Sequence, residues 1–184
     1  MLTTMISPFL LAPASAGGLA LATETVGLLY GTIGVVALIG GGILGGVVIA
    51  RLGLRRALWP MVVAMHAPNL LYVWVAYARP GELAVGSAIA VEHFGYGFGF
   101  SAYLVYLMQV SQRGLYPTTH YAISTGLMGL GALAAGYVSG DLVVALGFTG
   151  FFVVVAVVSI PSMIPLFFIP LDERAERPLA QPAG

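Results

Sequence analysis

The chain has 184 residues, of which 59% are hydrophobic and only 8% are charged. A water-soluble domain carries about a quarter charged residues, so this composition predicts that most of the surface faces lipid. The formal net charge is zero, and the basic residues, all of them Arg, form no cluster that suggests binding to nucleic acid. The absence of cysteine excludes a disulfide framework and a thiolate site.

The hydrophobic runs are continuous and longer than the alternating segments of about ten residues that make a membrane β-barrel. Because lipid offers no hydrogen-bond partners to an open strand edge, the spanning elements are predicted to be α-helices. The pattern favours an all-α membrane protein with five complete transmembrane helices, at residues 26–50, 57–78, 83–110, 121–146 and 148–171. The charged, proline-containing tail at residues 172–184 is expected to be disordered.

The N-terminal stretch allows two interpretations. A full span needs about 20 apolar residues, so residues 1–11 are too short and indicate only part of a membrane helix. The alternative is a cleaved signal peptide, because a short apolar core is followed by small residues. That alternative is disfavoured because the basic region is missing and because Pro8 and Pro13 interrupt the stretch.

The first two spans carry features of helix packing. Residues 26–50 contain no charged residue and hold three small-xxx-small pairs, which let helices approach closely: Gly27/Gly31, Gly41/Gly45 and Gly42/Gly46. The second span is expected to bend at Pro60 and Pro68. His66 and Asn69 lie near its middle, and we expect them to form hydrogen bonds between helices.

The arginines predict the orientation of the chain in the membrane. With five spans, six arginines fall on one side: Arg51, Arg55, Arg56, Arg113, Arg174 and Arg177. Only Arg79 falls on the other side. The positive-inside rule makes the side with six arginines cytoplasmic, so we expect a cytoplasmic C-terminus.

The third span, residues 83–110, carries an unusual set of polar side chains for a membrane-length helix. On a helical wheel, five residues spaced 4, 3, 4 and 3 apart fall within an arc of roughly 80°. They are Glu92, Tyr96, Gly99, Tyr103 and Tyr106, with the glycine as a gap in the row. Such a face fits a polar cavity better than lipid, since aromatic rings offer stacking surfaces and hydroxyls offer hydrogen bonds.

Two interpretations of Glu92 stay open. An ionisable residue inside a membrane is costly and marks a pathway for a proton or a polar solute. It is otherwise a structural carboxyl that is hydrogen-bonded to a neighbouring helix. His93 titrates near neutral pH when unperturbed, but adjacent helical residues are not expected to face each other, so we expect His93 to point away from Glu92.

The remaining polar residues suggest no further chemistry. His120 lies at a span end and Asp141 towards the end of the fourth span, so both are expected to be interfacial or structural. The histidines and acids show no metal-ligand spacing, and there is no nucleotide-binding loop or nucleophile motif. No metal and no cofactor are expected.

The loop at residues 46–56, GVVIARLGLRR, resembles the cytoplasmic-loop motif G-x-x-x-D-R-x-G-R-R of the major facilitator superfamily. Ala50 stands at its acidic position, and Leu54 replaces a basic residue. The residues that match are Gly46, Arg51, Gly53, Arg55 and Arg56. Together with GLLYGTIGVVALIGGGILGG and VEHFGYGFGFSAYLVYLMQVS, the loop resembles the C-terminal half of the muropeptide-permease and acetyl-CoA-transporter group.

The resemblance covers nearly all of residues 5–171 and implies a twelve-helix fold in two halves, of which this chain is the C-terminal six-helix half. It implies that the first, third and fourth spans line a central cavity and that the second and fifth are peripheral. His66 and Asn69 are then poor candidates for substrate contacts. The implied activity is secondary active transport by alternating access, often coupled to protons, with the missing N-terminal half in a longer gene or a separate polypeptide.

The leading hypothesis is therefore half of a secondary transporter in a bacterial inner membrane, which moves a polar or amphipathic small solute. Its predicted pathway residues are Glu92, Tyr96, Tyr103, Tyr106 and His93. The alternative is a structural or assembly protein of the lipid bilayer without transport activity. An intramembrane enzyme that uses Glu92 and His93 is disfavoured because no second acid or nucleophile is nearby, so the chain is predicted not to be an enzyme.

Overall fold

The computed structural model describes residues 2–168, which form helices joined by short turns, with no strand in that range. In chain order the elements are α1 (Leu2–Leu11), η1 (Ala14–Ala16), α2 (Thr23–Val26), η2 (Gly27–Gly34), α3 (Val35–Leu52), α4 (Leu54–His66), α5 (Asn69–Ala78), α6 (Glu82–Ser111), α7 (Pro117–Ser159) and η3 (Pro161–Phe168). The predicted tail, its two arginines and the end of the predicted fifth span lie outside the described residues.

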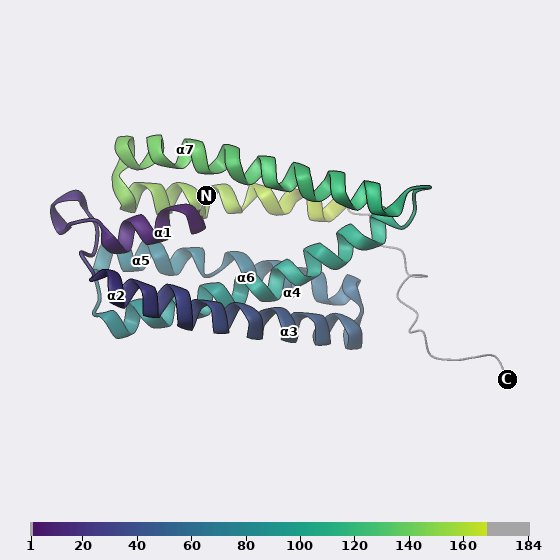
Figure 1. The fold of residues 1–184 in the computed structure, drawn as a ribbon, viewed down its shortest axis with the longest axis horizontal. Helices are drawn as coiled ribbons and strands as arrows, with labels where there is room; N and C mark the ends of the chain where they lie inside the picture. The colour runs from purple at the N-terminus through teal and green to yellow at the C-terminus, as the bar shows by residue number, and fades with distance from the viewer. Residues whose placement is uncertain (1, 169–184) are drawn as a thin grey trace.

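The helices lie along one long axis, and the chain reverses direction at the two ends of the bundle (Figure 1). The reversals include Gly53 between α3 and α4, and Gly147 within α7, with φ angles of 78° and 69°. This left-handed backbone conformation suits glycine because it has no Cβ atom. A third reversal, between α5 and α6, passes through Arg79.

Gly147 divides α7 into two arms that fold back on each other, a first arm of residues 117–146 and a second arm of residues 148–159 (Figure 1). Three helical stretches among the described residues are long and apolar enough to cross a membrane: Thr23–Leu52, Leu54–Ala78 and Pro117–Phe168. The prediction of a helical chain with membrane-length apolar helices is thus confirmed for the described residues. The number of five complete spans stays a prediction, because α6 is not among the three stretches.

Helix α6 lies at the centre of the packing, with its most extensive contacts to α3 and α4. Glycines make the close approach to α3 possible, since a Cβ atom on Gly41 would collide with the carbonyl of Phe94, and one on Gly97 with the carbonyl of Leu38. Gly45 also faces α6, whereas Gly27, Gly31 and Gly46 have no neighbouring atoms in the space a Cβ would fill. Of the predicted glycine pairs, Gly41/Gly45 is therefore the one that packs α3 against α6.

The two prolines of the second span behave differently. Helix α4 continues through Pro60 without a break. The regular helical hydrogen bonding is interrupted at Ala67 and Pro68, which separate α4 from α5 although both keep helical dihedral angles. Since proline lacks an N–H and clashes with the preceding turn, Pro68 accounts for this interruption.

An aromatic cluster holds α1, α5 and the second arm of α7 together. The ring of Phe9 lies 5.3 Å from that of Phe148 and 5.0 Å from that of Phe152, and Tyr72 packs 5.6 Å from Phe152. All four side chains are buried. These contacts close one end of the bundle.

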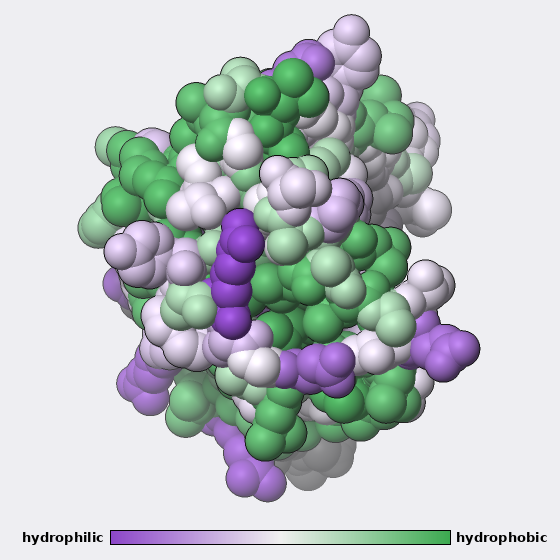
Figure 2. Space-filling model, turned by 90° about the vertical axis from the view of Figure 1, so that its left-hand side faces the viewer, coloured by the Kyte–Doolittle hydropathy of each residue, from purple (hydrophilic) through white to green (hydrophobic). Residues whose placement is uncertain are grey.

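Figure 2 views the end of the bundle that lies on the left of Figure 1. Hydrophobic residues dominate this face, and strongly hydrophilic ones are scattered between them (Figure 2). The chain reverses here at Arg79 and Gly147, and at the opposite end it turns next to Arg51, Arg55 and Arg113. The described arginines are thus unevenly divided between the two ends.

Candidate functional site

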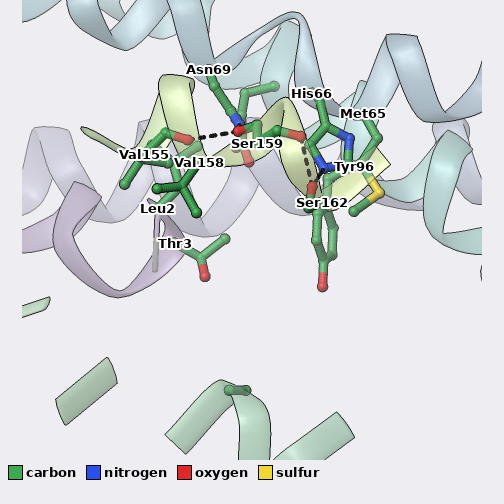
Figure 3. Close-up of a pocket in the computed structure, with 12 residues that line it drawn as sticks. Leu2, Thr3, Met65, His66, Asn69, Tyr96, Val155, Val158, Ser159 and Ser162 are labelled. Atoms are coloured by element: carbon green, nitrogen blue, oxygen red, sulfur yellow. Dashed lines mark hydrogen bonds between the residues drawn. The ribbon is translucent and has the colours of Figure 1, made fainter. Parts of the chain in front are cut away.

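A cavity of about 380 Å³ lies beside the middle of α6 and is walled by six elements, one of which, η3, contributes Ser162. Helix α6 contributes Glu92 and Tyr96, α4 and α5 contribute His66 and Asn69, and α1 contributes Thr3. The two arms of α7 supply Ala132 from the first and Val155, Val158 and Ser159 from the second. Figure 3 shows the side chains of α4, α5, α6 and the second arm of α7 gathered on one side, with the first arm across the open space.

A second cavity of about 390 Å³ adjoins the first and follows the same face of α6 towards its C-terminal end. Tyr96, Gly99, Tyr103 and Tyr106 all line it. Tyr96 stacks on Phe100, and Phe100 stacks on Tyr103, with ring centroids 5.4 and 5.9 Å apart. The row of residues singled out by their helical spacing therefore runs through both cavities.

Gly99 differs from its expected role as a gap in that row. A Cβ atom there would meet the carbonyl oxygen of Met61 at 2.7 Å and Cβ of Met65, both on α4. The space beside Gly99 is thus filled by α4. The glycine serves the close packing of α4 on α6 rather than an opening.

Glu92 is the most deeply buried charged residue of the site, with 3% of its surface exposed. Its Oε2 atom has no hydrogen-bond partner within the described residues. An ionised carboxylate accepts several hydrogen bonds, and leaving a buried acceptor unsatisfied is costly. The side chain of Glu92 lines the cavity, and both interpretations of its role stay open.

His93 corrects the expectation that it would point away from its neighbour. Its Nδ1 atom lies 2.8 Å from Oε2 of Glu92. The same nitrogen lies 3.0 Å from the carbonyl of Ile89, which only an N–H can satisfy. The single proton on Nδ1 is therefore directed at Ile89, which explains how Glu92 Oε2 is close to a ring nitrogen and still lacks a hydrogen bond.

The opposite side of His93 meets the π-helical segment η2. The ring packs edge-on against Tyr30 with centroids 4.7 Å apart, and a Cβ atom on Gly34 would lie 3.0 Å from the imidazole. Tyr30, Gly31, Glu92 and His93 line a further cavity of about 270 Å³. Wide π-helical turns are rare and often occur at functional sites, so this junction extends the candidate site to the first long helix.

His66 and Asn69 lie at the cavity although the family resemblance implied a peripheral position. Nδ2 of Asn69 donates a hydrogen bond of 2.8 Å to Oγ of Ser159, and Nε2 of His66 lies 3.4 Å from Oγ of Ser162 (Figure 3). The predicted hydrogen bond between helices is thus present at Asn69, whereas His66 makes only a long contact to Ser162. Both residues line the cavity, because α4, α5 and the second arm of α7 form one of its walls, and whether they contact a substrate stays a prediction.

Sequence reasoning missed Ser159 and Ser162 as residues of the site. Each lies where the helix is interrupted, since α7 ends at Ser159 and η3 begins at Pro161. The facing break at Pro68 lies beside Asn69 in the same way. Broken helices at membrane depth are tolerated where they line a cavity. The sequence signal for these two serines was therefore a proline next to polar residues, at Pro68 and again at Pro161.

The loop that resembles a transporter motif lies at the turn between α3 and α4. Gly53 has the left-handed conformation that ends α3, with Gly46 and Arg51 in the preceding helix and Arg55 and Arg56 in the first turn of α4. Arg51 lies in the last helical turn, where a cation is favoured by the helix dipole. This loop lies away from the cavities, and none of its matched residues lines them.

The other candidates remain outside the site. Asp141 is exposed on the first arm of α7, and His120 is exposed near the start of that helix. Within residues 2–168 no group of three or more His, Cys, Asp or Glu residues is arranged to hold a metal ion. The site is thus a polar and aromatic cavity with one buried carboxylate.

Membrane-length helices and a buried carboxylate beside a cavity, within the described residues, are typical of an integral membrane protein. Comparison with known proteins agrees. The chain is 29% identical to the anhydromuropeptide permease of Escherichia coli strain K12 over 141 residues, which are 77% of this chain and 28% of the permease. It is 26% identical over 136 residues to a protein named putative transporter AmpG 4 of Rickettsia conorii, covering 74% of this chain and 33% of that protein.

A further relative, putative transporter AmpG 1 of Rickettsia felis, is 24% identical over 169 residues, covering 92% of this chain and 37% of the relative. The chain is therefore similar in sequence to muropeptide permeases and related transporters, as its resemblance predicted. These relatives are named permeases and transporters, not enzymes, in agreement with the prediction. The chain spans about a third of the length of the curated relatives it matches. No family model and no solved structure matches it.

Proposed function

We propose that the chain forms one half of a secondary transporter of the major facilitator type, which moves a polar or amphipathic solute by alternating access. The observation that carries the proposal is Glu92, a buried carboxylate at the wall of a cavity whose Oε2 accepts no hydrogen bond within the described residues and lies 2.8 Å from Nδ1 of His93. A group of this kind inside a membrane protein is costly to maintain and suits a site that binds a proton or a polar solute.

Glu92 is the proposed proton site, and the tyrosine row is the proposed solute path. When Glu92 takes up a proton, Oε2 becomes neutral and the cost of burying it falls. When the solute and the proton bind in the same cavity, binding of the solute can change the affinity for the proton, and the reverse. Coupled transport requires such a mutual effect. Tyr96, Tyr103 and Tyr106 supply hydroxyls and ring faces along the adjoining cavity.

The proposed solute is of the kind that the relatives' names describe, an anhydromuropeptide, which combines a sugar with a peptide. The polar wall at Glu92 and the aromatic wall at Tyr103 suit a solute with both polar and apolar parts. A second six-helix half would complete the path, since the matched relatives are about three times as long as the matching part. The non-transporting structural role is not favoured, because the relatives with functional names are transporters.

We further propose that the protein lies in the inner membrane of a bacterium with the C-terminus in the cytoplasm. The support is the division of arginines between the two ends of the bundle. In this orientation Glu92 lies nearer the outside and Tyr106 nearer the cytoplasm. The solute then meets the carboxylate before the tyrosine row on the way in.

The experiment replaces Glu92→Gln in the native gene, so that any further sequence or partner polypeptide is retained. Gln keeps the shape of the side chain but cannot carry a proton, so we expect uptake of radiolabelled anhydromuropeptide driven by a pH gradient to be lost. Glu82→Gln, in the exposed first turn of the same helix, is the matched control and should leave uptake unchanged. Normal pH-driven uptake by the Glu92→Gln strain, with equal protein in the membrane, would refute the coupling role.

A further inference from the structure

The two main cavities meet at a shared set of residues, which we call the neck: Met65, His66, Tyr96 and Ser162. On one side of the neck lies the chamber with Glu92, Asn69 and Ser159. On the other side lies the chamber lined by Phe100, Tyr103 and Tyr106. A solute that spans both chambers contacts these four side chains.

His66 presents a hydrogen-bond acceptor at the neck. Its Nδ1 atom lies 3.0 Å from the carbonyl of Val62, and only a protonated nitrogen can bond to a carbonyl. The neutral ring then carries its lone pair on Nε2. Hydrogen bonding on α4 thus fixes which ring nitrogen accepts from the cavity.

Ser162 does not satisfy that acceptor. Its hydroxyl donates to the carbonyl of Ser159 at 2.7 Å, and a serine has a single hydroxyl proton. The contact between Ser162 Oγ and His66 Nε2 is correspondingly long, at 3.4 Å. The Nε2 lone pair therefore remains available to a donor in the cavity.

A second acceptor at the same chamber is the buried Oε2 atom of Glu92, which contacts Nδ1 of His93 but accepts no hydrogen bond within the described residues. The wall made by these two residues is thus rich in acceptors. A buried acceptor that stays unpaired is costly, so the wall discriminates against a solute that brings no donors.

We propose that His66 at the neck and Glu92 in the chamber beside it form an acceptor site that selects solutes bearing hydroxyl donors. The inference rests on the proposed transport function and assigns a specificity-determining role to His66, on a helix that the family resemblance implied to be peripheral. His66 is a specificity residue here, and the proton site remains Glu92. Donor groups of the solute replace the missing partners of both acceptors as it enters the neck.

The test compares uptake of radiolabelled anhydromuropeptide with that of its O-methylated form, in which sugar hydroxyl donors are removed. His66→Phe keeps an aromatic ring and removes Nε2, so KM for the unmodified probe should rise about three- to tenfold, the effect of losing one hydrogen bond. KM for the O-methylated probe should not change, so the preference between the two probes falls. His66→Gln, which restores an acceptor oxygen at the end of the side chain, should recover most of the preference.

The control is the same substitution at an exposed histidine, His120→Phe, which should leave both KM values unchanged. An equal change in KM for both probes, or no change for either, would overturn the acceptor site while the transport function stands. If the unaltered protein takes up neither probe, the proposed transport function fails. The neck is then tested by binding alone. The measurement is how well each probe protects Val158→Cys, which lines the Glu92 chamber, from a thiol reagent. Absence of protection by the unmodified probe, or equal protection by both probes, would overturn it.

Discussion

Gly41 of α3 lies directly against the backbone carbonyl of Phe94 on α6, with no room for a side chain between the two helices. Its neighbour Gly40 faces open space. The two adjacent glycines therefore differ in their packing, although they belong to one run of glycines in the sequence. This contact holds the helix that carries Glu92 in place against the first long helix.

We expect Gly41→Ala to destabilise the protein, by about 1–3 kcal/mol for forcing a methyl group into a packed contact. Gly40→Ala should be neutral or stabilising by up to about 1 kcal/mol, because alanine is the better helix former. Thermal unfolding of the purified chain in detergent measures the difference. Equal melting temperatures for the two variants would show that α3 and α6 do not approach as closely as this contact requires.

The hydrogen bond from Asn69 to Ser159 links the interrupted second span to the end of the second arm of α7. A double-mutant cycle with Asn69→Leu and Ser159→Ala should give a coupling energy of about 0.6 kcal/mol and at most about 1.7 kcal/mol, the range measured for such bonds in membranes. Unfolding in mixed micelles provides the four free energies. Strict additivity of the two substitutions would rule out the contact.

The two faces of α6 should differ in their access to water. Tyr103 lines the aromatic cavity with 38% of its surface exposed, whereas Val105 packs on the cluster around Leu54 and Met61. Because the chain has no cysteine, Tyr103→Cys and Val105→Cys each create a single reactive thiol. A membrane-impermeant thiol reagent should label Tyr103→Cys and spare Val105→Cys. Labelling of both at the same rate would refute the cavity face.

The proposed orientation places the turn before α6 outside the cell and the turn after it inside. Gly81→Cys and Gln112→Cys are both in exposed positions that flank this helix. In intact cells, an impermeant reagent should modify Gly81→Cys at once and Gln112→Cys only after the membrane is permeabilised. The reverse pattern would place the C-terminus outside and invert the direction of the proposed solute path.

Much of the site could be predicted from the sequence of a single helix. The spacing of Glu92, Tyr96, Tyr103 and Tyr106 placed them on one face, and all four line the adjoining cavities. Helical geometry is local, since each residue turns by a fixed angle from the one before it. The same rule failed for His93, because it describes side chains at their ideal directions and does not exclude a contact between flexible neighbours.

The opposite wall was decided only by the tertiary structure. His66 and Asn69 lie far along the chain from Ser159 and Ser162, and no local periodicity links two such segments. Their meeting depends on how α4, α5 and the second arm of α7 pack together around the aromatic cluster at Phe152. The amino-acid sequence by itself determined that most of the surface suits lipid, that the fold is helical and that α6 has a polar face. These properties follow from composition and from the helical repeat. Which helices close around that face, and hence which acceptor meets the solute at the neck, depends on long-range packing that no single segment encodes.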